Sequence, residues 1–148
     1  MSFFAGKYES KLDTKGRLVL PSKFKGLLPE DGGNELIIQQ GFEPCLLIYP
    51  MLEFKKVLSK VSGLSEFNEE NRQLQLNFFS SISNVELDVN GRFLIQKNML
   101  AYAHLQKEAI FIGMGNKIVI WDPETYQNHL IKDQREYSKL AEKHLDKQ

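Results

Sequence analysis

Short apolar runs recur along the chain, and turns containing glycine or proline separate them. Runs of about four to eight residues between such turns are typical of β-strands. Two of the predicted strands end at Leu12 and Leu87, and the other six cover residues 17–20, 35–39, 45–49, 92–95, 109–112 and 117–121. A predicted turn at residues 41–44 joins the strands at 35–39 and 45–49, and another at residues 113–116 joins the strands at 109–112 and 117–121.

Segments with helical patterns alternate with these strands. The clearest follows Pro50, and its apolar positions are Met51, Phe54, Val57, Leu58 and Val61. Another helix is predicted after Asp122 and Pro123, because aspartate is favoured at a helix N-cap and proline in the first turn. Further predicted helices cover residues 22–28, 68–79 and 97–103, and residues 132–148 predict either a solvent-facing helix or a frayed end.

The chain contains an internal repeat. Residues 12–21 align with residues 87–96, and leucine, aspartate, glycine and arginine are identical at matching positions. Residues 41–49 align with residues 113–121 in the same order. The first copy also has a turn-rich run at residues 29–34 that is shortened in the second. Two matches in the same order indicate a duplicated unit of strands and helices.

The size of each copy favours two halves that pack together. About 50 ordered residues make only a small core, and short strands leave edges that must be paired or covered. We therefore expect a mainly β fold with helices (an α+β fold) in which two halves form an internal pseudo-dimer. The predicted boundaries are residues 7–53 for the first repeat, 54–81 for a helical connector, 82–125 for the second repeat and 126–148 for a C-terminal helical tail.

Composition and charge narrow the function. The chain has 19 lysine and arginine residues and 19 aspartate and glutamate residues, so its formal net charge is zero. This argues against a protein that holds polyanions by bulk charge, although residues 1–25 carry six basic and two acidic side chains. The single cysteine, Cys45, excludes an internal disulfide and a cysteine zinc site. We expect a soluble cytoplasmic protein, because no apolar run could cross a bilayer and the start lacks a secretory pattern. We also expect no metal and no cofactor.

The pattern Asp-x-x-Gly-Arg occurs once in each copy, at residues 13–17 and 88–92. Aspartate stabilises a tight turn with its side chain, and glycine accepts a positive φ. The structural explanation is an ordinary turn in which arginine and aspartate form a weak surface ion pair. The functional explanation is that each turn holds an arginine outward, where its guanidinium binds guanine edges or phosphates through paired hydrogen bonds.

The functional explanation defines a set of candidate residues. The predicted DNA-binding residues are Lys15, Gly16, Arg17, Asn90, Gly91 and Arg92, and the predicted turn-stabilising residues are Asp13 and Asp88. Lys15 of the first copy is replaced in the second by Asn90, which is uncharged but able to bond base edges or phosphates. We therefore expect the first turn to bind an anion more strongly than the second.

The order of these motifs resembles that of the MraZ transcriptional regulators. The resemblance extends from about residue 1 to residue 126, and besides the two turns it includes Lys7-Tyr8-Glu9, Pro44-Cys45-Leu46-Leu47-Ile48-Tyr49-Pro50, Phe78-Phe79-Ser80 and Gly115-Asn116-Lys117-Ile118-Val119-Ile120-Trp121. The chain departs from the family pattern at Gln96, where the family often has proline, as the first copy does at Pro21.

This resemblance implies a tandem pair of AbrB-like swapped-hairpin halves that form one pseudo-dimer. It also implies a ring-shaped homo-oligomer in the nucleoid, bound to double-stranded DNA at promoter repeats upstream of its own division and cell-wall operon. The family's Asp-x-x-x-Arg motif falls on Asp13 and Arg17, and again on Asp88 and Arg92. Whether the second turn contacts DNA is left open at this stage.

Two other classes of protein are less well supported. An enzyme is disfavoured because the chain has no Gly-x-Ser-x-Gly elbow, no glycine-lysine phosphate loop and no His-Glu-x-x-His helix. A protein-interaction or antitoxin-like module would bind a partner through its helices, with a docking face formed by Met51, Phe54, Phe78 and Phe79. Apolar stripes on helices are more often core or self-association surfaces, so DNA binding is the main prediction.

Overall fold

The structure, a computed structural model, describes residues 3–29 and 35–146 of the 148-residue chain. Most of the turn-rich run at residues 29–34, and the last two residues of the predicted tail, lie outside these ranges. The strands formed by the described residues are β1 (Phe4–Lys11), β2 (Arg17–Val19), β3 (Glu35–Gln40), β4 (Leu46–Pro50), β5 (Ile82–Glu86), β6 (Arg92–Leu94), β7 (Glu108–Gly115) and β8 (Ile118–Trp121). The helices are α1 (Ser22–Lys25), α2 (Met51–Ser62), α3 (Glu69–Ser80), α4 (Lys97–Tyr102), α5 (Pro123–His129) and α6 (Gln134–Leu145).

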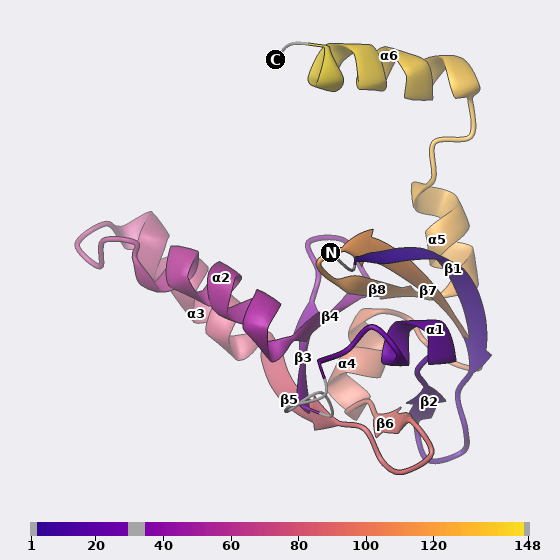
Figure 1. The fold of residues 1–148 in the computed structure, drawn as a ribbon. Coiled ribbons are helices and arrows are strands. Elements are labelled where there is room, and N and C mark those ends of the chain that lie inside the picture. Colours follow the sequence, from indigo (N-terminus) through magenta and orange to yellow (C-terminus); the bar gives the residue numbers. More distant parts are fainter. Residues whose placement is uncertain (1–2, 30–34, 147–148) are drawn as a thin grey trace.

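Most of the strands form one antiparallel sheet in the order β1-β7-β8-β4-β3-β5 (Figure 1). The strands β1, β3 and β4 of the first repeat correspond to β5, β7 and β8 of the second. Exchanging the two repeats therefore gives the same strand order, read from the opposite edge of the sheet. The first strand of each repeat pairs with the third strand of the other, so that β1 pairs with β7 and β5 pairs with β3. The halves are therefore interlocked, which confirms the predicted α+β fold of two AbrB-like swapped-hairpin halves.

The strands β2 and β6 form a separate antiparallel ribbon with one strand from each repeat. Its facing residues are Arg17 and Leu94, Leu18 and Phe93, and Val19 and Arg92. A two-stranded ribbon is marginally stable by itself in water, so it must pack against another element. The two repeats share this ribbon, and neither repeat forms it alone.

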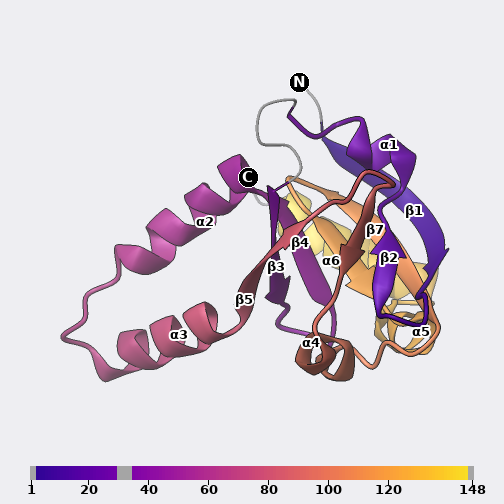
Figure 2. The same cartoon turned by 90° about the horizontal axis from the view of Figure 1, so that it is seen from below.

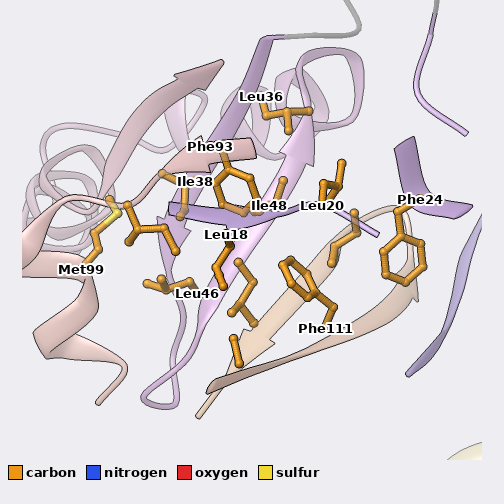
Figure 3. Close-up of a cluster of buried hydrophobic side chains, with 14 of the residues drawn as sticks. Leu18, Leu20, Phe24, Leu36, Ile38, Leu46, Ile48, Phe93, Met99 and Phe111 are labelled. Atoms are coloured by element: carbon orange, nitrogen blue, oxygen red, sulfur yellow. The ribbon is translucent and has the colours of Figure 1, made fainter. Parts of the chain in front are cut away.

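The main hydrophobic core lies between this ribbon and one face of the sheet (Figure 3). Leu18 and Phe93 point inward from the ribbon and are 0% and 1% exposed. They belong to the same cluster as Ile48 and Phe111 of the sheet. Burial of one such side chain contributes roughly 1.5–3 kcal/mol to folding. Because side chains alternate along a strand, this packing turns the neighbours of Leu18 and Phe93 toward solvent.

A second, smaller hydrophobic cluster covers the other face of β3 and β4. It contains Ile37 and Tyr49 from the strands, Phe54 from α2 and Phe78 from α3. The rings of Phe54 and Phe78 stack with their centroids 5.8 Å apart. Beyond this cluster, α2 and α3 run side by side away from the sheet (Figures 1 and 2).

The starts of α2 and α5 agree with their sequence signals. Helix α2 begins directly after Pro50, and α5 begins after Asp122, whose carboxylate accepts the backbone N–H of Thr125 at 3.1 Å. The predicted tail contains α6, which lies apart from the sheet (Figure 1). Among the helices of the described ranges, none has the length and apolar character that a membrane span requires.

The second hairpin differs from the prediction. The sequence predicts a turn at residues 113–116. In the structure β7 continues to Gly115, so the turn is shorter, and across it the N–H of Met114 donates to the carbonyl of Lys117 at 2.9 Å. The cause is β1, which pairs with this end of β7 and places Ala5 opposite Met114. Pairing with a strand that is distant in sequence therefore extends β7 beyond its local signal.

Candidate nucleic-acid interface

Two equivalent tight turns lead into the strands of the ribbon. In the first, the carbonyl of Asp13 accepts the N–H of Gly16 at 3.1 Å, and in the second the carbonyl of Asp88 accepts the N–H of Gly91 at 3.0 Å. The φ angles of the two glycines are 83° and 77°. This is the left-handed region, where a side chain is unfavourable, so both turns require glycine at this position.

The carboxylate of Asp13 organises the first turn. Its Oδ1 accepts the backbone N–H groups of Lys15 and Arg17, both at 2.9 Å, and its Oδ2 accepts the Nε–H of Arg17 at 2.7 Å. These interactions lower the pKa of Asp13, and the backbone hydrogen bond from Arg17 is the largest cause. The carboxylate is therefore ionised at neutral pH and holds the arginine from two sides.

The carboxylate of Asp88 does the same in the second turn. Its Oδ1 accepts the backbone N–H groups of Asn90 at 2.8 Å and Arg92 at 2.9 Å, and its Oδ2 accepts the Nε–H of Arg92 at 3.0 Å. The pKa of Asp88 is also lowered, again chiefly by the backbone hydrogen bond from the arginine. The duplicated sequence motif therefore produces duplicated hydrogen-bond geometry.

Each arginine is fixed at Nε, and its terminal amino groups stay available. Within residues 3–29 and 35–146, the hydrogen bonds of the Arg17 and Arg92 side chains are those from Nε to aspartate. The arginine side chains are 28% and 32% exposed. The two terminal amino groups of a guanidinium form the fork that binds a guanine edge or a phosphate. Anchoring at Nε orients this fork before any ligand arrives.

The ribbon places both arginines on the same outward face. Arg17 lies directly opposite Leu94, and Arg92 lies directly opposite Val19. Residues that face each other across an antiparallel pair point to the same side. Arg17 and Arg92 are therefore diagonal neighbours on one face, and the backbones of such neighbours lie roughly 7–8 Å apart. Val19 and Leu94 are exposed beside them. The result is a small surface with two oriented guanidinium groups and two apolar side chains.

The other predicted site residues lie at the ends of this surface. Lys15 and Asn90 are exposed at the tips of the two turns. A hollow of about 520 Å³ opens beside the second turn, and its lining includes Asn90, Gly91, Lys23 and Lys25. The two lysines come from α1 of the first repeat, and the sequence alone did not indicate that they lie next to the second turn.

Comparison with known proteins decides the family. The family model described as "MraZ protein, putative antitoxin-like" matches residues 3–77 and again residues 78–148. This chain belongs to the MraZ family. A relative named Transcriptional regulator MraZ, from Cytophaga hutchinsonii, is 50% identical over 145 residues, which cover 98% of this chain and 96% of the relative. A relative of the same name from Finegoldia magna is 36% identical over 139 residues, which cover 94% of each chain.

Membership of the MraZ family confirms the resemblance that the motifs carry. The two matches of the family model also confirm that the chain is a tandem repeat. The MraZ family consists of transcriptional regulators, which confirms the prediction that the chain is not an enzyme.

Outside the two turns, the groups that could carry chemistry in this MraZ-family chain are Cys45 and the side chains that could bind a metal ion. Cys45 is buried, and desolvation, with a smaller contribution from Glu43, raises the pKa of its thiol to about 11, so it is a core residue and not a nucleophile. In the part of the chain that the structure describes, no group of three or more histidine, cysteine, aspartate or glutamate residues could hold a metal ion.

Phe54 and Phe78 of the alternative docking face are buried in the second cluster, while Phe79 is 48% exposed.

Proposed function

We propose that this protein is a sequence-specific, DNA-binding transcriptional regulator. It acts in the cytoplasm, on the nucleoid, at repeated double-stranded DNA elements upstream of its own division and cell-wall operon. The relatives named as transcriptional regulators support the regulatory role. The observation that carries the DNA-binding role is the shared outward face of the ribbon, where aspartate orients both Arg17 and Arg92 through Nε.

The chemistry of this face suits the major groove of DNA. A guanidinium fork pairs with the O6 and N7 atoms of guanine, and an exposed apolar side chain contacts the thymine methyl group. Arg17 and Arg92 supply two forks, and Val19 and Leu94 supply two apolar contacts. Lys15 and Asn90 are exposed at the turn tips, and we propose that they bind the phosphates or base edges at either side.

One copy of this surface is too weak to select a promoter. A good bidentate contact contributes about 1–3 kcal/mol of discrimination between bases, and the chain has no net charge to raise its affinity over a distance. We therefore propose a ring-shaped homo-oligomer in which several ribbons bind successive DNA repeats. The first bound repeat raises the effective concentration of the others.

Exposed apolar side chains support self-association. Leu76 and Phe79 of α3 are 69% and 48% exposed, and Tyr137 and Leu145 of α6 are 64% and 67% exposed. An apolar groove of about 390 Å³ lies beside α2 and α3, with Tyr49 and Val57 in its lining. Exposed apolar surface of this kind marks interaction sites, and a second copy of the chain is the partner that a ring requires.

The proposal is tested with DNA from the region upstream of the protein's own gene. Footprinting of the wild-type protein should show periodic protection, and gel-shift affinity should be lost in Arg17→Ala while light scattering still reports the assembled oligomer. Lys60→Ala, on α2 away from the ribbon, is the matched control for removal of a cation. An assembled Arg17→Ala protein that shifts the same DNA with wild-type affinity would refute the proposed role of the turns.

A further inference from the structure

The short helices of the two repeats correspond residue by residue. Phe24 of α1 and Met99 of α4 are both buried in the main core. The next residue in each helix is Lys25 or Leu100, and each donates its backbone N–H, at 3.0 Å, to the carbonyl of the residue that precedes the helix. Lys25 and Leu100 are therefore equivalent positions, one charged and one apolar.

The swapped connections place each of these residues against the turn of the other repeat. A Cβ atom built on Gly16 would lie 3.5 Å from Cδ1 of Leu100. A Cβ atom built on Gly91 would lie 3.6 Å from Nζ of Lys25. The first turn thus has a leucine from the second repeat beside it, whereas the second turn has a lysine from the first repeat.

This exchange offsets the difference in charge between the turn tips. The first turn has its own lysine, Lys15, and the apolar Leu100 as its neighbour. The second turn has the uncharged Asn90, and its neighbour is the ammonium group of Lys25. Each turn therefore has a lysine next to its glycine in addition to its arginine, although Lys15 and Lys25 occupy different positions in the repeat.

The environment of Lys25 suits an anionic ligand. Lys25 lines the 520 Å³ hollow together with Ser22, Lys23 and Asn90, and Glu9 is the acidic residue in that lining. Among the described residues, Lys25 forms no ion pair, since the ion pairs found are those of Arg17, Lys56 and Arg92. The hollow thus combines two ammonium groups, an amide and several hydroxyls with one carboxylate, beside the turn that carries Arg92.

We infer that Lys25, with Asn90, binds a backbone phosphate of DNA at the second turn, so that both turns of one subunit contact the duplex. This inference rests on the proposed DNA-binding function. It replaces the expectation that the first turn binds an anion more strongly, because that expectation counted only the lysine within each turn. Lys25 is then a phosphate-contacting residue, and it strengthens binding to any sequence by a similar factor.

The decisive variant is Lys25→Leu, which gives the second turn the neighbour that the first turn has. Fluorescence anisotropy is measured on two duplexes of equal length, the region upstream of the gene and a scrambled sequence, over a range of salt concentrations. Loss of one phosphate contact should reduce the slope of log K against log salt by about 0.9 for each bound subunit. At about 0.15 M salt, this corresponds to roughly fivefold weaker binding per contact on both duplexes.

A charge-matched control and a rescue variant separate this role from a general loss of charge. Lys55→Leu removes an exposed lysine of α2 and should leave affinity and slope unchanged. Lys25→Leu combined with Asn90→Lys returns a lysine to the second turn, at the position that Lys15 has in the first, and should restore the wild-type slope. Thermal unfolding of each variant checks that the fold is retained.

The outcomes distinguish the inference from the proposed function. If the wild-type protein binds neither duplex, the proposed function fails. If the wild-type protein binds and Arg17→Ala does not, but Lys25→Leu retains the wild-type affinity and slope, only the inference about Lys25 is overturned. A loss that is confined to the upstream duplex would also overturn it, because a phosphate contact acts on every sequence.

Discussion

The backbone N–H of Leu20, in the first repeat, donates to the carbonyl of Gly91, in the second, at 2.9 Å. The equivalent bond runs the other way, from Ile95 to Gly16, at 3.0 Å. The end of each ribbon strand is therefore closed by the turn of the other repeat. We therefore expect a change in one turn to move the strand that follows the other, which would couple the positions of the two arginines.

Gly91→Ala should destabilise the fold. The φ of Gly91 is 77°, and a left-handed conformation costs a residue with a side chain about 1–2 kcal/mol. Gly26→Ala is the matched control, because the φ of Gly26 is −65° and alanine accepts this value without strain. Urea unfolding measures both changes, and equal stabilities of the two variants would contradict the role assigned to the Gly91 turn.

Leu18→Ala should destabilise the fold by about 2–5 kcal/mol. Leu18 is 0% exposed, beneath the outward face of the ribbon that carries Arg17 and Arg92, and removal of its side chain leaves a cavity. The adjacent Val19 is 48% exposed, and Val19→Ala should change stability by no more than about 0.5 kcal/mol. Chemical denaturation gives both values. The packing described for the ribbon would be wrong if the two variants were destabilised equally.

Acid should weaken the fold through the two turn aspartates. Folding lowers the pKa of Asp13 and of Asp88. Their contribution to the stability of the fold is therefore complete above the pKa of aspartate in the unfolded chain, about 4, and it is lost as the pH falls through the lower folded pKa values. The double variant Asp13→Asn and Asp88→Asn should be less stable than the wild type at pH 7. The difference should shrink as the pH falls below the unfolded pKa value.

Thermal unfolding as a function of pH measures this effect. Asp146→Asn, at the exposed end of α6, is a control for removal of one carboxylate away from the turns. A stability difference between the double variant and the wild type that stays constant from neutral to acid pH would contradict the assigned ion pairs.

Local features of the fold were predictable from the residues that form them. The turn at Asp13 depends on an aspartate side chain and a glycine that lie within five residues of one another, and the helix start at Asp122 depends on a capping interaction of the same range. The pairing of Arg17 with Asp13 follows from the same short spacing. The repeat was visible because both copies keep these local signals.

Long-range pairing was not predictable from the residues themselves. The end of β7 shows this, since its local sequence predicts that the turn begins at residue 113, and the pairing of β1 with β7 extends the strand to Gly115. Lys25 shows the same for the site. The alignment of the repeats places Lys25 opposite Leu100, but it does not show that α1 lies beside Gly91 of the other repeat.

By itself, the sequence determined that this chain is a tandem repeat of strands, turns and helices, and that each repeat presents an arginine held by an aspartate. Only the tertiary structure decided that Arg17 and Arg92 lie on one ribbon and that Lys25 lies beside the second turn. The physical reason is that turns and caps are formed between near neighbours in the chain. Strand exchange, in contrast, is selected by the burial of residues such as Leu18 and Phe93, which are far apart in the sequence and meet only in the shared core.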